Sequence, residues 1–270
     1  LPPCPPPPSH SPGGEAAASD GFYERLGAQV VHFATPEFVR CALPAVYAPP
    51  DLDHLDVAGA ATPEALAWRE SRLPVVCRLA HTLVARSPRG RVDLLRRHSL
   101  DPARVVVIPE VPATLARPEP PPEALRRLAQ ALGMPRPFAL YPAATWPHKN
   151  HLGLLEALAL LRDRQGLPLR VACPGAPYSP HWPEVQRRVA QLGLEEQMRF
   201  PGALPAADLR GLYRLAHALV IPSLYETRCL PVFEAWQEGL PVACGSRAAL
   251  PAGGEDAVLR FDAESVETVA

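Results

Sequence analysis

Short apolar runs alternate with helix-like stretches along most of this chain, and this alternation constrains the fold more than any other feature. Strands that alternate with helices build parallel sheets covered by helices, so the sequence predicts an α/β fold. The expected strands are 30–33, 45–48, 82–85, 105–108, 138–143, 169–173, 198–200, 218–221, 241–244 and 258–261. The expected helices are 63–79, 90–98, 151–164, 183–192, 206–216 and 230–238.

A cluster of six prolines between residues 109 and 122 separates the two series of strands and helices. Proline-rich segments are extended and semi-rigid, so we expect an interdomain linker here. We predict one α/β domain over 20–112, a linker over 113–135 and a second α/β domain over 136–270. Residues 1–19 are mostly Pro, Ser, Gly and Ala. They offer few large apolar groups for packing, and we expect them to be disordered.

The composition excludes several functional classes. A net charge of −1 gives no general reason to expect a nucleic acid or an anionic membrane as partner. No apolar run reaches the ~20 residues that a membrane helix needs. The six cysteines are scattered, without a Cys-x-x-Cys pair, which favours free thiols in a reducing compartment. We therefore expect a cytoplasmic protein, and we leave a peripheral membrane association open.

The loop expected at residues 141–151 carries the first candidate binding group. Lys149 is the only lysine of the chain, and Asn150 is the only asparagine. The other 26 of the 27 lysine and arginine residues are therefore arginines. A lysine retained in an arginine-rich chain indicates a need for a compact ammonium group, although chance is the alternative explanation. The loop follows a predicted strand and precedes a predicted helix. Open α/β sheets bind their ligands at such positions, at the carboxyl ends of the strands.

A second candidate loop spans residues 222–236 and carries two carboxylates. Glu226 lies in the loop, and Glu234 lies one turn into a helix that begins near Leu230. The start of a helix offers backbone N–H groups and a positive dipole end, which suit a phosphate. The two carboxylates can accept hydrogen bonds from sugar hydroxyls. The alternative is structural: Glu234 only complements the helix dipole, and Glu226 is solvated.

Together these motifs resemble a family 4 glycosyltransferase, also called glycosyl transferase group 1. The matching residues are the segment 147–151 (Pro-His-Lys-Asn-His), the Glu226 and Glu234 pair with seven residues between them, Gly239 with Pro241, and the segment 250–257. The resemblance is strong over 136–270 and weak over 28–112. It implies a GT-B fold with two Rossmann-like domains. By this comparison the N-terminal (acceptor) domain is incomplete, and the chain looks truncated at both ends.

The resemblance also implies roles for individual residues. Lys149, with Asn150 beside it in the motif, would bind the diphosphate of a nucleotide-sugar donor. Glu226 would contact the transferred sugar, which makes Lys149 and Glu226 the candidate catalytic residues. Glu234 would hold the ribose, and the backbone at Cys229 and Leu230 would complete the phosphate site. The family uses no metal ion and no cofactor for this step, and its members mostly retain the anomeric configuration.

Some positions depart from the family pattern. The family commonly has Glu-Gly-Phe-Gly where this chain has Glu-Thr-Arg-Cys at 226–229. Glycines there let the backbone approach phosphate closely, and Arg228 is a candidate replacement for a missing second cation at 144–145. Pro50 stands where the family has a histidine, and His54 is a displaced candidate. The triplet Asp-Leu-Asp at 51–53 is a weak manganese-binding signal.

Three functions remain open on the sequence alone. The first is a retaining glycosyltransferase that acts on a glycan or a lipid-linked acceptor. The second is a nucleotide-sugar-binding fragment with impaired turnover, suggested by the incomplete acceptor domain and by the departures at Pro50 and at 227–229. The third is a sugar-nucleotide epimerase of the same architecture, against which the Glu226 and Glu234 pair argues. The donor base, the sugar and the acceptor are not specified by these residues.

Overall fold

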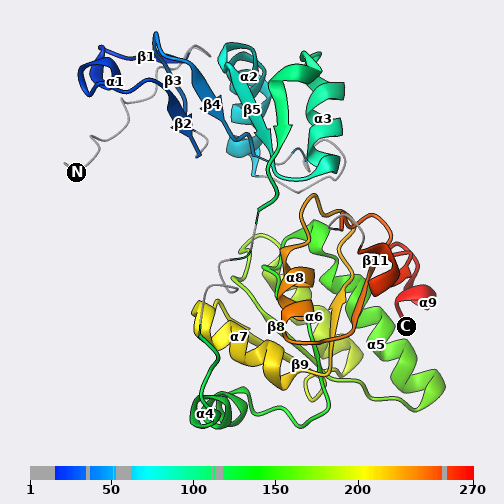
Figure 1. Ribbon diagram of the computed structural model, residues 1–270. Coiled ribbons are helices and arrows are strands. Elements are labelled where there is room, and N and C mark those ends of the chain that lie inside the picture. Colours follow the sequence, from blue (N-terminus) through cyan, green and yellow to red (C-terminus); the bar gives the residue numbers. More distant parts are fainter. Residues whose placement is uncertain are drawn as a thin grey trace. The chain divides into compact units, whose positions relative to one another are not determined.

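The computed structural model of the 270-residue chain describes residues 16–34, 37–50, 52, 62–110, 112, 118–250 and 254–270. Contacts between residues divide the chain into two compact units, and the second begins at Glu110. Each unit contains a sheet of parallel strands covered by helices (Figure 1). The predicted α/β class is therefore confirmed, whereas the predicted domain limits stay a prediction.

The N-terminal unit has a four-stranded parallel sheet in the order β2-β4-β5-β6. Its helix α2 (Pro63–Leu79) begins as the sequence predicts, because the Thr62 hydroxyl accepts a hydrogen bond from the Ala65 N–H at 3.2 Å. The core of this unit is centred on Tyr47, Cys77 and Leu83, each almost fully buried. Its other elements include α1 (Phe22–Arg25), β2 (Val31–Phe33), β4 (Ala45–Tyr47), β5 (Thr82–Ala85), α3 (Pro88–His98) and β6 (Val105–Val107).

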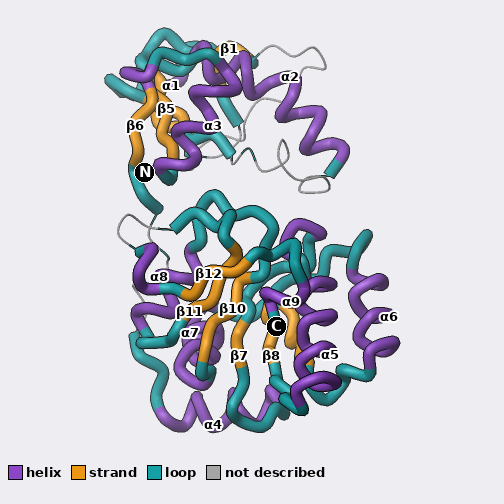
Figure 2. The backbone as a smooth tube through the Cα atoms, turned by 90° about the vertical axis from the view of Figure 1, so that its right-hand side faces the viewer, coloured by secondary structure: helices purple, strands orange, loops and turns teal. Residues whose placement is uncertain are grey.

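The C-terminal unit has a six-stranded parallel sheet in the order β12-β11-β10-β7-β8-β9. Its strands are β7 (Ala139–Leu140), β8 (Val171–Pro174), β9 (Met198–Gly202), β10 (Ala218–Ile221), β11 (Val242–Gly245) and β12 (Leu259–Phe261). Its helices are α4 (Pro122–Leu132), α5 (His151–Gln165), α6 (Trp182–Leu192), α7 (Ala206–Leu215), α8 (Leu230–Gln237) and α9 (Val266–Val269). In Figure 2, α5 and α6 lie to the right of the strands, and α7 and α8 lie to the left.

The order of the strands reverses between β7 and β10. From β7 the chain proceeds to β8 and β9 in one direction, and from β10 it proceeds to β11 and β12 in the other. Loops that leave two such neighbouring strands diverge to opposite faces and open a crevice at the carboxyl edge. The two loops predicted to bind the donor follow β7 and β10, so the topology brings them to this switch point.

The strand predicted over 138–143 is shorter in the structure. Only Ala139–Leu140 form β7, although the Tyr141 N–H still donates to the Ala172 carbonyl at 2.8 Å. The next residue is Pro142, which has no N–H to continue the ladder. The chain then turns, with the Ala143 N–H donating to the Tyr141 carbonyl at 3.1 Å.

Helix α4 occupies much of the segment 113–135, which was predicted to be a linker. Pro122 stands in its first turn, where proline is favoured because its missing N–H has no helical partner. Leu125 and Leu128 pack against the C-terminal core, and Leu132 is buried in it. The last proline of the cluster therefore begins a helix, and the cluster is not one continuous extended segment.

The prediction that residues 1–19 are disordered is wrong for its last residues. Ala17 and Ala18 form β1 (Ala17–Ala18) and pair in parallel with β3 (Val39–Arg40). The Ser19 N–H donates to the Arg40 carbonyl at 2.8 Å. Backbone pairing of this kind does not need the large apolar side chains whose absence suggested disorder. Residues 1–15 lie outside the described residues.

Two further expectations from composition can be compared with the structure. The five cysteines that it describes are free, and four of them are buried. Among the described residues, no helix has the length and the apolar character that a bilayer crossing requires.

Gly175, which follows β8, supports the loop that carries Lys149. A Cβ at this position would overlap the Ala143 carbonyl group and lie 2.7 Å from the Ala144 nitrogen. We predict that Gly175→Ala lowers the free energy of unfolding by about 1–3 kcal/mol or more, because two backbone segments must separate. Urea denaturation followed by tryptophan fluorescence measures this change.

Gly90→Ala is the control, since its added Cβ would meet only the Ser87 hydroxyl, at 3.3 Å. Equal stability of Gly175→Ala and the wild type would contradict the close backbone approach.

Candidate functional site

Lys149 and Glu226 meet at the switch point between β7 and β10. The Lys149 Nζ lies 2.6 Å from the Glu226 Oε1, in an ion pair whose side chains are 20% and 14% exposed. The structure thus brings together the two residues that sequence analysis singled out as catalytic candidates, from loops 77 residues apart. A cation and a carboxylate are accordingly placed side by side at the edge where open α/β sheets bind ligands.

A buried hydrogen-bond network holds this pair in place. The Ser223 hydroxyl donates to the Glu226 Oε1 at 2.8 Å, the same oxygen that accepts from Lys149. The Tyr141 hydroxyl donates to the Lys149 carbonyl at 2.6 Å and lies 3.0 Å from the Ser223 Oγ. Burial raises the pKa of Tyr141 well above its usual value, so its hydroxyl remains a donor. Both loops are therefore fixed to one polar cluster.

Asn150 ties the two loops to a third segment. Its φ of 55° is left-handed, a conformation that asparagine tolerates better than most residues. Its Oδ1 caps α5 by accepting from the Gly153 N–H at 3.2 Å. Its Nδ2 donates to the Pro222 carbonyl at 3.1 Å and to the Ala263 carbonyl at 2.8 Å. The structure thus gives this predicted donor-binding residue contacts that position Lys149.

The start of α8 differs from the phosphate-binding helix end that the sequence suggested. The Cys229 N–H donates to the Ala249 carbonyl at 3.3 Å, and the Leu230 N–H donates to the Arg228 carbonyl at 2.8 Å. Both N–H groups assigned to phosphate therefore have partners within the chain. Burial raises the pKa of the Cys229 thiol well above its usual value, so it is a neutral thiol at physiological pH.

Arg228, the candidate second cation, forms an ion pair with Glu110. The two residues are 118 positions apart in the sequence, so sequence spacing could not reveal the pair. At the other suggested position, Thr145 is buried and its hydroxyl accepts from the Tyr178 N–H at 2.8 Å. Arg228 is therefore held by Glu110 in this structure, and Thr145 supplies no charge.

Glu234 lies one turn into α8, as predicted, and is partly buried. Its Oε2 accepts a hydrogen bond from the Tyr213 hydroxyl at 2.6 Å. Sequence analysis did not identify Tyr213, which lies on the preceding helix α7 and belongs to no motif. The alternative that Glu234 only complements the helix dipole does not account for this contact.

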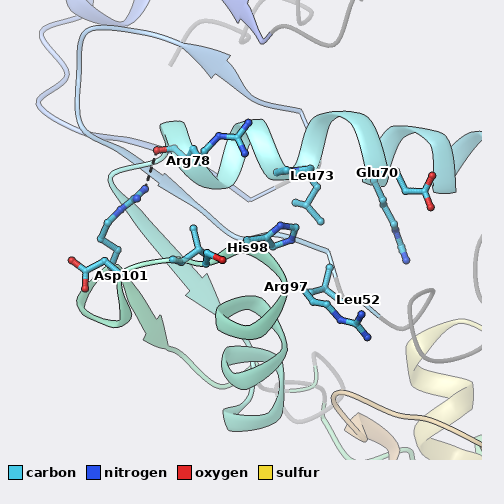
Figure 3. A pocket seen from close by; sticks show the side chains of 12 residues that line it. Leu52, Glu70, Leu73, Arg78, Arg97, His98 and Asp101 are labelled. Atoms are coloured by element: carbon cyan, nitrogen blue, oxygen red, sulfur yellow. Dashed lines mark hydrogen bonds between the residues drawn. The ribbon is translucent and has the colours of Figure 1, made fainter.

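The N-terminal unit contains a cavity of about 620 Å³ between α2 and the end of α3 (Figure 3). Four arginines contribute to its wall, and Arg104 donates to the Cys77 and Arg78 carbonyls at the end of α2 at 3.0 and 3.1 Å. Its lining residues are Leu52, Arg69, Glu70, Leu73, Pro74, Arg78, Arg97, His98, Ser99, Leu100, Asp101 and Arg104. Arginines outnumber carboxylates two to one in this wall, which favours an anionic or polar occupant.

Of the weak candidates in the N-terminal unit, only Pro50 belongs to the part of the chain that the structure describes. His54 and the carboxylates Asp51 and Asp53 lie outside the described residues. Pro50, which replaces the family histidine, is partly buried at the end of the segment that follows β4.

His151 is a fully buried histidine at the start of α5. Its ring lies against Tyr141 and Phe200, with centroid distances of 4.9 and 6.3 Å. Among the described residues, neither of its ring nitrogens has a hydrogen-bond partner. Burial lowers the pKa of His151 to about 3, and the nearby charges of His181 and Lys149 act in the same direction. His151 is therefore neutral throughout the physiological pH range.

Comparison with known proteins assigns the C-terminal part of the chain to a family. Residues 126–252 match the family described as glycosyl transferases group 1, which confirms the resemblance drawn from the motifs. A D-inositol 3-phosphate glycosyltransferase of Corynebacterium glutamicum (strain R) is 31% identical over 207 residues, which cover 73% of this chain and 49% of that protein. The chain spans from about a third to about half of the length of the curated relatives it matches first.

Solved structures show the same architecture. A glycosyltransferase from Rickettsia africae ESF-5 has a TM-score of 0.68 at 16% identity, covering 92% of this chain and 66% of its own. The Anabaena protein HepE, in complex with UDP-glucose, has a TM-score of 0.64 at 17% identity, covering 84% of this chain and 62% of its own. At these identities the likeness establishes the fold, and it confirms the predicted GT-B type.

The lowered pKa of His151 predicts a pH dependence of stability. In the unfolded chain this histidine takes up a proton below its ordinary pKa of about 6.5, whereas in the folded chain it does so only near pH 3. The stabilisation is complete above pH 6.5 and is lost as the pH falls toward 3. Between pH 7 and pH 5 the loss amounts to about 2 kcal/mol. His151→Phe should remove this component from the pH dependence of urea unfolding.

His217→Gln, at an exposed histidine of the same unit, is the control and should leave the wild-type pH dependence intact. A pH dependence in His151→Phe as steep as that of the wild type would show that His151 is not the neutral buried group described above.

Proposed function

Because residues 126–252 are a glycosyl transferases group 1 domain, we propose that the C-terminal unit binds a nucleoside diphosphate sugar at the switch point between β7 and β10. The chain is then part of a glycosyltransferase that moves the sugar to a glycan or a related acceptor with retention of configuration. The observation that carries this proposal is the Lys149–Glu226 ion pair at the carboxyl edge of neighbouring parallel strands.

Lys149 is the chief side-chain cation for the donor diphosphate in this proposal. A diphosphate that enters the crevice competes with Glu226 for the ammonium group. Negative charge grows on the diphosphate as its bond to the sugar breaks, and a preorganised cation stabilises that charge. Tyr141 and Asn150 hold the backbone on both sides of the charge, which limits the reorganisation needed during the reaction.

Glu226 acts as the partner of the transferred sugar. In the described arrangement its Oε1 accepts hydrogen bonds from both Lys149 and Ser223. When the diphosphate takes over Lys149, the carboxylate remains held by Ser223 and can accept from sugar hydroxyls. Donor binding therefore releases Glu226 from its ion pair with Lys149. Glu234, farther along α8, is assigned to the ribose.

The acceptor is assigned to the N-terminal unit, where the arginine-rich cavity suits a hydroxylated molecule with a phosphate or carboxylate group. The name of the Corynebacterium relative, a D-inositol 3-phosphate glycosyltransferase, supports an acceptor of this class.

Calorimetry with D-inositol 3-phosphate and with inositol as probes tests this assignment of the acceptor to the cavity. The phosphate ester should bind more tightly, and Arg97→Ala should reduce that preference. Equal binding of the two probes would overturn it.

A binding protein with impaired turnover is the second candidate, and the start of α8 favours it. The Cys229 and Leu230 N–H groups are already hydrogen-bonded within the chain, so the phosphate site depends more heavily on Lys149. Donor binding without sugar transfer or donor hydrolysis would select this candidate over the enzyme. Conversion of the nucleotide sugar into its epimer in the absence of an acceptor would instead indicate the third open function, an epimerase.

The central test of the donor site is Lys149→Ala. Loss of a charge-assisted contact of roughly 2–3 kcal/mol corresponds to a fall in diphosphate affinity of about 30- to 150-fold. Calorimetry with UDP, GDP and ADP measures this affinity. If Lys149 stabilises the leaving group, turnover should fall further than donor binding does, because the charge is largest in the transition state.

Two variants control this experiment. Lys149→Arg keeps the charge but changes the shape, and we expect only partial recovery because the guanidinium is larger and planar. Arg228→Ala breaks the ion pair with Glu110 and should affect nucleotide binding less than Lys149→Ala does. Unchanged nucleotide affinity in Lys149→Ala would defeat the proposed donor site. Loss of binding in Arg228→Ala alone would move the phosphate site to the segment 227–229.

A further inference from the structure

Tyr213 is a buried tyrosine whose hydroxyl reaches a proposed ligand-binding carboxylate. It lies on α7 and is 1% exposed. Its hydroxyl donates to the Glu234 Oε2 at 2.6 Å, across the contact between α7 and α8. A buried hydroxyl needs a hydrogen-bond partner, and a carboxylate is the strongest acceptor that a side chain offers.

The direction of this hydrogen bond is fixed by its surroundings. Burial and the negative charge of Glu234 raise the pKa of Tyr213 well above its usual value. The phenol therefore keeps its proton and is the donor, while the carboxylate is the acceptor. An ionised carboxylate has about four lone-pair positions on its two oxygens, so accepting from Tyr213 does not prevent it from accepting from a ligand.

The contact constrains the conformation of Glu234. A glutamate side chain has three rotatable bonds, and the Tyr213 hydroxyl holds the carboxylate at the end of these bonds on the partly buried face of α8. Hydroxyl-to-carboxylate bonds of this length are short and strong, and Tyr213 is itself immobilised in the C-terminal core. Binding groups must be held within ~0.5 Å of their productive position to act on a ligand. Tyr213 supplies such support to Glu234 from a separate helix.

We propose that Tyr213 is a positioning residue that orients the Glu234 carboxylate toward the ribose hydroxyls of the donor nucleotide. This inference rests on the proposed function, because it requires a nucleoside diphosphate in the site. Tyr213 does not touch the ligand, and its effect passes through Glu234. If Tyr213 has this positioning role, its hydroxyl contributes to recognition of the ribose and not to recognition of the diphosphate.

Tyr213→Phe tests the proposal, since it removes the hydroxyl and keeps the buried ring. The probes are UDP, GDP and ADP, and the tightest binder of the three is compared with its 2′,3′-dideoxy counterpart by calorimetry. We expect the variant to bind the ribonucleotide about 10-fold more weakly, because a carboxylate that is no longer held in place forms poorer hydrogen bonds with the ribose hydroxyls. Binding of the dideoxy nucleotide should stay within twofold of the wild type.

A double-mutant cycle separates positioning from a general loss of structure. In a Glu234→Ala background, Tyr213→Phe should change ribonucleotide affinity less than twofold, because the group that it orients is gone. Tyr47→Phe is the matched control. It removes another fully buried tyrosine hydroxyl, on β4 of the N-terminal unit, and should leave ribonucleotide affinity unchanged.

The outcomes distinguish this inference from the proposed function. If the wild type binds none of the three nucleotides, the proposed function fails and this inference fails with it. If the wild type binds, but Tyr213→Phe weakens both forms of the nucleotide equally or neither, the donor site stands and the positioning role is overturned. A loss of ribonucleotide affinity that persists in the Glu234→Ala background would also overturn it.

Discussion

The ion pair between Lys149 and Glu226 is the interaction on which the proposed site depends. It joins the loops that leave β7 and β10, at the point where the strand order reverses. Two opposite charges at 14–20% side-chain exposure are stable only with good geometry and further hydrogen bonds, and Ser223 supplies one of these. In the proposed function, a donor rearranges this pair: its diphosphate takes the cation, and its sugar takes the carboxylate.

The backbone around the ion pair is held by several contacts that fix the position of Lys149. Asn150 adopts a left-handed conformation, caps α5 and donates to the ends of two other loops. Gly175 lets the segment after β8 approach the Ala143 backbone, and the buried Tyr141 hydroxyl reaches the Lys149 carbonyl. None of these three residues carries a charge. Their role is to fix the position of a residue that does, which is how a loop becomes a preorganised site.

Local sequence patterns predict part of this site, whereas contacts between segments that are distant in the sequence could not be predicted. Lys149 and Glu226 could be placed together because each follows an apolar run, and the carboxyl ends of parallel strands share one edge. Helix α2 could be placed because Thr62 and Pro63 form a recognisable helix start. The Tyr213–Glu234 and Arg228–Glu110 contacts could not, because they depend on how separate segments pack. The same holds for the hydrogen bonds that occupy the Cys229 and Leu230 N–H groups. Helix α4 was missed because its first proline resembled the end of a linker.

Because Lys149 is the only lysine of the chain, its side chain can be observed selectively. Reductive methylation with ¹³C-formaldehyde labels this side chain and the terminal amine, keeps the positive charge, and gives a distinct dimethyl-lysine NMR signal. If Lys149 binds the donor diphosphate, titration with the tightest binder among UDP, GDP and ADP should shift this signal, with the same dissociation constant that calorimetry gives for the labelled protein. A nucleotide that binds by calorimetry while the Lys149 signal stays unchanged at saturation would contradict a diphosphate site at Lys149, as would the absence of any nucleotide binding.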